Sequence, residues 1–117
     1  MIQLGLVTAE DEEESMRQLK RFFMHNTSHW LGLDVHDVGT YQPGEKPRLL
    51  EEGMVLTIEP GLYIAGWRSD LEDVDQAWKG IGIRIEDDVH VTSEGPDVLS
   101  DDCPKQVDEI EAIIGSV

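Results

Sequence analysis

The stretch MVLTIEPGLYIA, residues 54–65, contains two strand patterns separated by one proline. Apolar side chains alternate with others over residues 54–58, which predicts a β-strand that places Glu59 on the face opposite the aliphatic one. Pro60 has no N–H to donate to a neighbouring strand, so this strand should bulge or break directly after Glu59. The apolar run at 62–65 predicts the returning strand. This part of the chain is therefore expected to form a sheet.

A longer alternating pattern, at residues 81–91, predicts one continuous strand. Its aliphatic face is formed by every second residue or nearly so, namely Ile81, Ile83, Ile85, Val89 and Val91. Arg84 and Glu86 lie on the opposite face. The acidic stretch that precedes this strand, residues 66–79, is predicted to be a surface excursion.

Helices are predicted on both sides of this β-rich centre. Thr8 is a suitable N-cap for a helix over residues 10–22, which carries acidic residues in its first turn and basic ones in its last. Its apolar stripe is Met16, Leu19 and Phe23. Pro104 is predicted to begin a second helix, with an apolar stripe of Val107, Ile110, Ile113 and Ile114. The order helix, strands, helix predicts an α+β fold, in one domain over residues 1–117 because no linker divides the chain.

Acidic residues dominate the composition. The 117 residues include 25 Asp and Glu against 9 Lys and Arg, which gives a formal net charge of -16. Such a charge repels nucleic acid and anionic membranes, so neither is expected as a partner. The single cysteine, Cys103, cannot form an internal disulfide, which fits a reducing compartment. No apolar run approaches transmembrane length and no signal pattern follows Met1, so we expect a cytoplasmic protein.

Imidazole and carboxylate groups occur in apolar surroundings at three places. The stretch HNTSHWLGLDVHD contains the histidines His25, His29 and His36. Glu59 and Glu86 each lie in a β-rich segment among aliphatic neighbours. An unpaired charge there would cost several kcal/mol, so a bound cation would explain this pattern, and one imidazole with two carboxylates suits Mn²⁺, Zn²⁺, Co²⁺ or Fe²⁺. The pattern leaves open an alternative, in which the carboxylates lie on an exposed strand face and the histidines are ordinary loop residues.

Three motifs together resemble the C-terminal part of the catalytic domain of Xaa-Pro aminopeptidases (aminopeptidase P). They are SHWLGLDVHDVG at 28–39, EPGLY at 59–63 and GIRIEDD at 82–88. The resemblance covers nearly the whole chain and implies the C-terminal half of the pita-bread metallopeptidase fold, a curved antiparallel sheet with flanking helices. Prolidase, a dipeptidase of the same family, shares most of these motifs and is the alternative. Trp30 after His29 favours aminopeptidase P.

The resemblance also implies a function. Family members remove an N-terminal residue that precedes proline, using water activated between two metal ions, usually Mn²⁺. The implied metal ligands are His29, Glu59 and Glu86. By the same resemblance Glu59 also acts as acid or base and Glu86 bridges the two ions. His25 and His36 are implied to contact the proline-containing peptide and to take part in catalysis, and Arg84 to lie just behind the metal site.

Two metal-binding aspartates of this family lie upstream of the matched part, and residues 1–20 contain nothing similar. We therefore expect a fragment of the catalytic domain that binds at most one metal ion, weakly, and is inactive alone. Whether the chain is an enzyme by itself is left open. The apolar surface of such a half-domain could be covered by a second copy or by a missing N-terminal half. A non-catalytic half-domain that self-associates and a metal-free structural remnant are therefore the alternatives.

Overall fold

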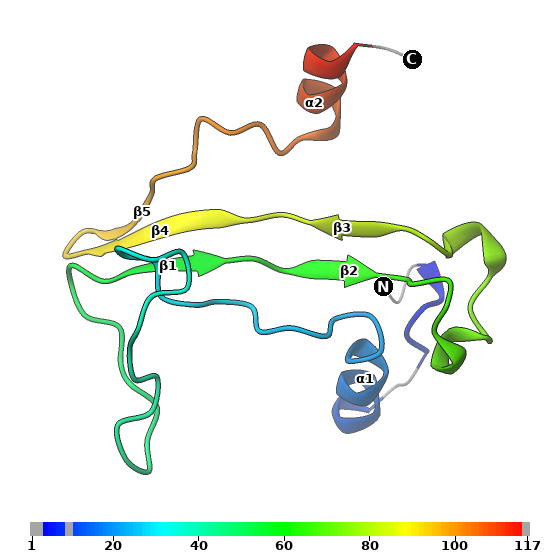
Figure 1. Cartoon of the computed structure of the whole chain (residues 1–117), viewed down its shortest axis with the longest axis horizontal. Helices are drawn as coiled ribbons and strands as arrows, with labels where there is room; N and C mark the ends of the chain where they lie inside the picture. The colour runs from blue at the N-terminus through cyan, green and yellow to red at the C-terminus, as the bar shows by residue number, and fades with distance from the viewer. Residues whose placement is uncertain (1–3, 9–10, 116–117) are drawn as a thin grey trace. The chain divides into compact units, whose positions relative to one another are not determined.

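The computed structural model describes residues 4–8 and 11–115 and shows an α+β chain, which confirms the predicted fold class. Its elements in chain order are α1 (Glu12–Leu19), β1 (Val55–Ile58), β2 (Gly61–Tyr63), β3 (Gly82–Arg84), β4 (Asp87–Thr92), β5 (Gly95–Val98) and α2 (Val107–Ile114), with short 3-10 turns η2 (Ser69–Leu71) and η3 (Gln76–Trp78) between β2 and β3 (Figure 1). The chain divides into two compact units, which are Met1–Asn26 with Pro60–Arg84, and Thr27–Glu59 with Ile85–Val117. We call them unit 1 and unit 2.

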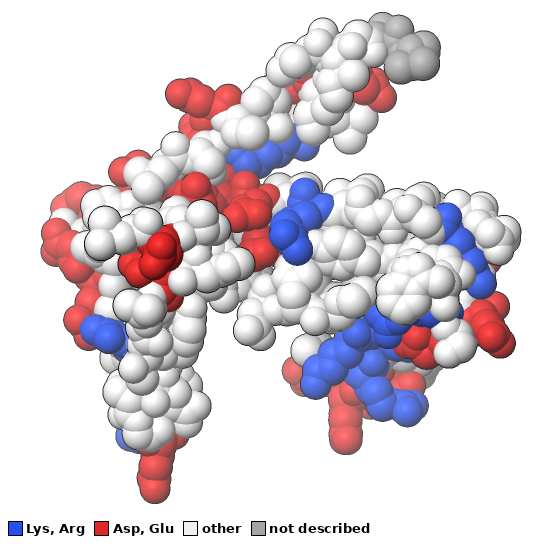
Figure 2. Space-filling view, viewed as in Figure 1, with Lys and Arg blue, Asp and Glu red and all other residues white. Residues whose placement is uncertain are grey.

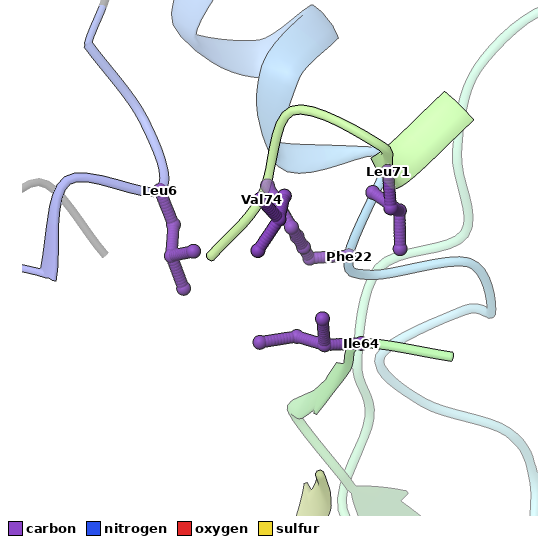
Figure 3. Packing of buried hydrophobic residues seen from close by; sticks show 5 residues of the cluster. All are labelled: Leu6, Phe22, Ile64, Leu71 and Val74. Atoms are coloured by element: carbon purple, nitrogen blue, oxygen red, sulfur yellow. The ribbon is translucent and has the colours of Figure 1, made fainter. Parts of the chain in front are cut away.

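Unit 1 contains α1 and a two-stranded antiparallel sheet of β2 and β3, in which Leu62 faces Ile83. Its core is a cluster of five buried side chains from four parts of the sequence, shown in Figure 3: Leu6, Phe22, Ile64, Leu71 and Val74. Phe22 is fully buried, just after the end of α1, and its carbonyl accepts the N–H of Tyr63 at 2.9 Å. The core therefore ties the helix to the sheet of the same unit.

The helix predicted over residues 10–22 differs from α1 in its bounds, its N-cap and its apolar stripe. α1 begins at Glu12, where the side chain of Asp11, rather than Thr8, caps it by accepting the N–H of Glu14 at 2.9 Å, and it ends at Leu19 rather than at residue 22. Residues 9 and 10 themselves lie outside the described part of the chain. Met16 of the predicted apolar stripe is 49% exposed, whereas Phe22 is 0% exposed.

The acidic stretch at 66–79 is also more than a surface excursion, because two of its apolar residues, Leu71 and Val74, belong to the core. Its acidic residues remain at the surface, where Asp73 pairs with Arg21 and Asp70 pairs with Arg68. Figure 2 shows basic side chains (blue) lying among acidic ones (red) on the visible face. The hydrogen bonds from these arginines hold the pKa of each aspartate below its ordinary value. The stretch therefore combines a buried apolar side with a charged outer side.

Unit 2 contains a three-stranded antiparallel sheet in the order β1-β4-β5. Leu56 of β1 faces Val89 of β4, which in turn faces Val98 of β5. The extended segment at residues 27–31 runs antiparallel to β1 and is joined to it by backbone bonds, from Thr57 N–H to the carbonyl of His29 at 3.0 Å and from Glu59 N–H to the carbonyl of Thr27 at 2.7 Å. This segment thus brings the second histidine alongside the strand that ends at Glu59.

The strand predictions were correct in kind and wrong in pairing. The apolar run at 62–65 does not return along the first strand, because β2 covers Gly61–Tyr63 and pairs with β3. The predicted continuous strand at 81–91 is two strands, β3 and β4, interrupted at Ile85 and Glu86. The sequence analysis did not predict β5. Each break contains a carboxylate, since Glu59 lies between β1 and β2 and Glu86 lies between β3 and β4.

The last helix, α2, begins at Val107 rather than at Pro104 and buries none of its residues. All four residues of its predicted apolar stripe are exposed. The segment before it is fastened to β4 by Lys105, whose ammonium group lies 2.8 Å from the Asp87 carboxylate and donates to the carbonyl of Ser100 at 2.9 Å. No helix in the described part of the chain is long and apolar enough to cross a membrane.

Candidate metal centre

Glu59, which is buried, and His29, which is half-buried, form the inner part of a candidate metal centre in unit 2. Glu59 follows the last residue of β1 and is 6% exposed, so it does not lie on a solvent-facing strand surface. The backbone bonds that join residues 27–31 to β1 place the His29 side chain beside it, with Nε2 of His29 3.1 Å from Oε1 of Glu59. A carboxylate this deeply buried needs a positive partner, because desolvation strongly disfavours an isolated charge.

The tautomer of His29 is set by its other nitrogen. Nδ1 lies 3.0 Å from the carbonyl of Trp30, which can only accept, so Nδ1 carries the proton. Nε2 then presents a lone pair to the Glu59 carboxylate. Two lone pairs that face each other repel, and only a proton or a cation between them changes this into an attraction. A carbonyl that holds the outer nitrogen of a histidine is also the usual arrangement behind a metal-ligating imidazole.

Glu86 supplies the third ligand. One ligand atom from each of His29, Glu59 and Glu86 lies within 4.8 Å of the other two. Glu86 is exposed, and it lies at the break between β3 and β4, while Glu59 lies at the break between β1 and β2. The donor set of one nitrogen and two carboxylate oxygens therefore fits a divalent cation such as Mn²⁺ or Zn²⁺.

His36 lies against the same cluster. Its ring meets the His29 ring edge to face, with centroids 4.3 Å apart. Trp30 lies between these two histidines in the sequence, and its ring is stacked on Tyr41. The backbone N–H of Trp30 donates to the Tyr41 hydroxyl at 3.0 Å, which fixes the chain next to His29. The structure therefore brings four of the six residues singled out from the sequence together in unit 2.

The other two, His25 and Arg84, belong to unit 1 and meet there on one hydroxyl group, that of Tyr63. Arg84 Nε donates to the Tyr63 oxygen at 2.7 Å, and His25 Nε2 lies 3.0 Å from the same oxygen. His25 Nδ1 lies 2.7 Å from the carbonyl of Asn26, so it carries the proton and Nε2 accepts from Tyr63. The Tyr63 hydroxyl therefore receives one hydrogen bond from Arg84 and donates one to His25.

Sequence reasoning missed both Tyr63 and the buried threonine of β1, Thr57. The Tyr63 ring packs against two glycines. A Cβ on Gly61 would lie 2.5 Å from the Tyr63 hydroxyl oxygen, and a Cβ on Gly82 would lie 3.2 Å from Cδ1 of the ring. Thr57 is 1% exposed and donates its hydroxyl to Oε1 of Glu59 at 3.0 Å. A polar residue two positions before a carboxylate in a strand shares its face, and this was the available signal.

Comparisons with known proteins agree with these motifs. Residues 5–93 match metallopeptidase family M24. The chain is 49% identical over 115 residues to an Xaa-Pro aminopeptidase of Escherichia coli, a match that covers 97% of this chain and 25% of that protein. It is similar to the solved structure of Pseudomonas aeruginosa aminopeptidase PepP, with a TM-score of 0.86 and 48% identity over 97% of this chain and 25% of that one.

A structure of Escherichia coli aminopeptidase P with the inhibitor Pro-Leu gives a TM-score of 0.77 at 46% identity and covers 95% of this chain and 25% of that one. The chain thus spans about a quarter of the length of the relatives it matches.

Proposed function

Because the chain belongs to metallopeptidase family M24, we propose that residues 1–117 are the C-terminal half of a pita-bread catalytic domain that removes an N-terminal residue preceding proline. The observation that carries this proposal is the convergence of His29, Glu59 and Glu86 within 4.8 Å in unit 2. The similarity to Xaa-Pro aminopeptidases at 49% identity supports the aminopeptidase over the prolidase-like alternative. A cytoplasmic location of the protein stays a prediction from the sequence.

In this proposal His29, Glu59 and Glu86 would together hold a divalent ion, with Mn²⁺ as the native metal. The ion, when bound, acts as a Lewis acid and lowers the pKa of water. The described residues supply the rest. Glu59 can take up and return a proton at the carboxylate oxygen that is not bonded to Thr57, and the His36 ring covers one side of His29.

The group around Tyr63 in unit 1 suits contact with a peptide. Arg84 presents a positive charge close to the Tyr63 hydroxyl, and His25 offers an imidazole that the same hydroxyl orients. An arginine is a suitable partner for peptide carbonyl or carboxylate oxygens, because its N–H groups form charge-assisted hydrogen bonds. We assign His25, His36 and Arg84 to substrate binding and to stabilising charge that develops on the substrate.

One imidazole and two carboxylates are too few for the two-ion centre of an intact enzyme. Two doubly charged ions about 4 Å apart repel by roughly 4 kcal/mol even at the dielectric constant of water, four times the value for unit charges. Further bridging carboxylates are needed to offset that repulsion, and the cluster contains only two glutamates. We therefore propose that the 117-residue chain binds one ion and does not cleave Xaa-Pro peptides alone.

A chimera tests the function directly. This chain would replace the matching quarter of the Escherichia coli Xaa-Pro aminopeptidase, and release of the N-terminal residue from an Xaa-Pro-Xaa peptide would be measured with Mn²⁺. The chimera should be active, Glu59→Gln should abolish turnover, and Glu94→Gln, at an exposed position after β4, should leave it unchanged. A folded chimera that cleaves no peptide, or one that tolerates Glu59→Gln, would contradict the proposal.

Self-association is the second candidate role, and the exposed apolar stripe of α2 favours it. A dimer or larger assembly at micromolar concentration is expected by light scattering. A monomer with a cooperative melt would show that the chain needs no cover for this surface.

A further inference from the structure

Thr57 lies at the centre of the buried half of the candidate metal centre. It is the third residue of β1 and is 1% exposed. Its hydroxyl oxygen accepts the backbone N–H of His29 at 3.1 Å and its hydroxyl hydrogen is directed to Oε1 of Glu59 at 3.0 Å. Its own backbone N–H donates to the carbonyl of His29 at 3.0 Å. One residue therefore makes three hydrogen bonds to His29 and Glu59, two of the three candidate ligands.

The direction of these bonds is fixed by what each group can do. A threonine hydroxyl has one hydrogen to donate and lone pairs that accept. Because the N–H of His29 can only donate, it occupies a lone pair of the hydroxyl, and the hydrogen is left for the carboxylate. Glu59 thus receives a hydrogen bond at Oε1, the oxygen that also lies 3.1 Å from Nε2 of His29.

This arrangement restricts the freedom of both ligands. The Glu59 carboxylate cannot rotate without losing the Thr57 hydrogen bond, and His29 is held at its backbone by Thr57 and at Nδ1 by the Trp30 carbonyl. Outer partners of this kind orient metal ligands, and their loss typically costs about 10- to 100-fold in metal affinity. Valine has nearly the same shape as threonine and would fill the same space in β1, so that replacing Thr57 by valine removes the hydroxyl and its two hydrogen bonds while keeping the packing.

We propose that Thr57 is a positioning residue of the metal centre, which sets the distance and orientation of Glu59 and His29 before a divalent ion binds. The proposal rests on the proposed function, since it supposes that these two residues are ligands. It goes beyond that function in assigning a role to a residue that makes no contact with substrate and is not itself a ligand. The competing explanation is that Thr57 serves only to fill the space beneath the sheet.

Binding of Co²⁺ to the 117-residue chain separates the two explanations, because the visible absorption of this ion reports both affinity and coordination geometry. Thr57→Val keeps the shape and removes the hydroxyl, and it should weaken Co²⁺ binding about 10- to 100-fold. Thr57→Ser keeps the hydroxyl and should bind within a few-fold of the unaltered chain. The matched control is Thr92→Val, which removes a hydroxyl bonded to the Gly95 carbonyl in the turn between β4 and β5 and should leave binding unchanged.

The shape of the absorption spectrum at saturation distinguishes positioning from a loss of stability. Partial unfolding would lower the amplitude of the spectrum and leave its shape intact, whereas a displaced carboxylate changes the shape. If Thr57→Val does not fold, Thr57→Ser and Thr57→Ala give the same comparison, since these two variants differ only by the hydroxyl oxygen.

Equal affinity and equal spectra with and without the hydroxyl would overturn the positioning role while leaving the proposed function standing. Absence of saturable Co²⁺ binding to the unaltered chain would instead overturn the proposed function and the role of Thr57 with it.

Discussion

Replacement of Phe22 by alanine should abolish the folded state of unit 1. Phe22 is fully buried and belongs to a core that contains five buried side chains among the described residues of unit 1. Truncation of a buried phenylalanine costs about 3–5 kcal/mol, because the lost transfer free energy and the cavity add. That is as much as the whole core of so small a unit supplies, about 3–5 kcal/mol. The variant should therefore lose cooperative unfolding of this unit.

Urea denaturation followed by circular dichroism measures the total free energy of unfolding, and hydrogen exchange locates the loss. The amides of Tyr63 and Ile64, which are bonded to the carbonyls of Phe22 and Ile81, should lose their protection from exchange. The matched control is Met16→Ala on α1, which should change stability by about 0.5 kcal/mol or less because Met16 is half exposed. If Met16→Ala lowers the free energy of unfolding as much as Phe22→Ala does, then α1 packs through its predicted apolar stripe and the described core is wrong.

Two further predictions concern single contacts. Gly61→Ala places a methyl group 2.5 Å from the Tyr63 hydroxyl oxygen and should displace that ring, which changes the NMR signal of His25. Gly66→Ala, where the nearest atom would be Cβ of Lys79 at 3.7 Å, should leave the signal unchanged, and an unchanged signal in both variants would contradict the packing. The hydrogen bond between Lys105 and Asp87 holds the pKa of Asp87 below its ordinary value and raises the pKa of Lys105 above its ordinary value, so the pair stabilises the folded chain at pH values between the two. Stability should fall as pH drops through the lowered pKa of Asp87 and as pH rises through the raised pKa of Lys105. Thermal melts between pH 3 and 7 should show less acid sensitivity in Lys105→Met, and an identical profile would refute the link.

The sequence predicted the fold class and the elements of the sheet because alternation is a local property. Pairing is not local. The run after Pro60 was expected to return along β1, whereas β2 pairs with β3, a strand that comes later in the chain and that local alternation cannot identify as the partner. The prediction of which residues form the core was wrong for the same reason. Leu71 and Val74 lie in an acidic stretch with no period, and only their contacts with Phe22 show that they are buried.

The residues of the candidate metal centre were easier to single out than their supports. Glu59 and Glu86 stand out as carboxylates among aliphatic residues, and the structure places both at strand breaks in reach of His29. Thr57 and Tyr63 resemble ordinary strand residues in the sequence. Their importance comes from hydrogen bonds that cross between segments, such as the 3.0 Å contact of Tyr63 with His25, 38 positions away.

Titration of the 117-residue chain with Mn²⁺, followed by calorimetry and by the electron paramagnetic resonance of the free ion, tests the central claim most directly. The account predicts one saturable, weak site that Glu59→Gln weakens by at least about tenfold, which is the effect that loss of an outer partner alone can have. Glu94→Gln, remote from the cluster in sequence and exposed, should leave the site unchanged. Two tight sites, no saturable binding, or binding that survives Glu59→Gln would contradict the assignment of His29, Glu59 and Glu86 as a single metal centre.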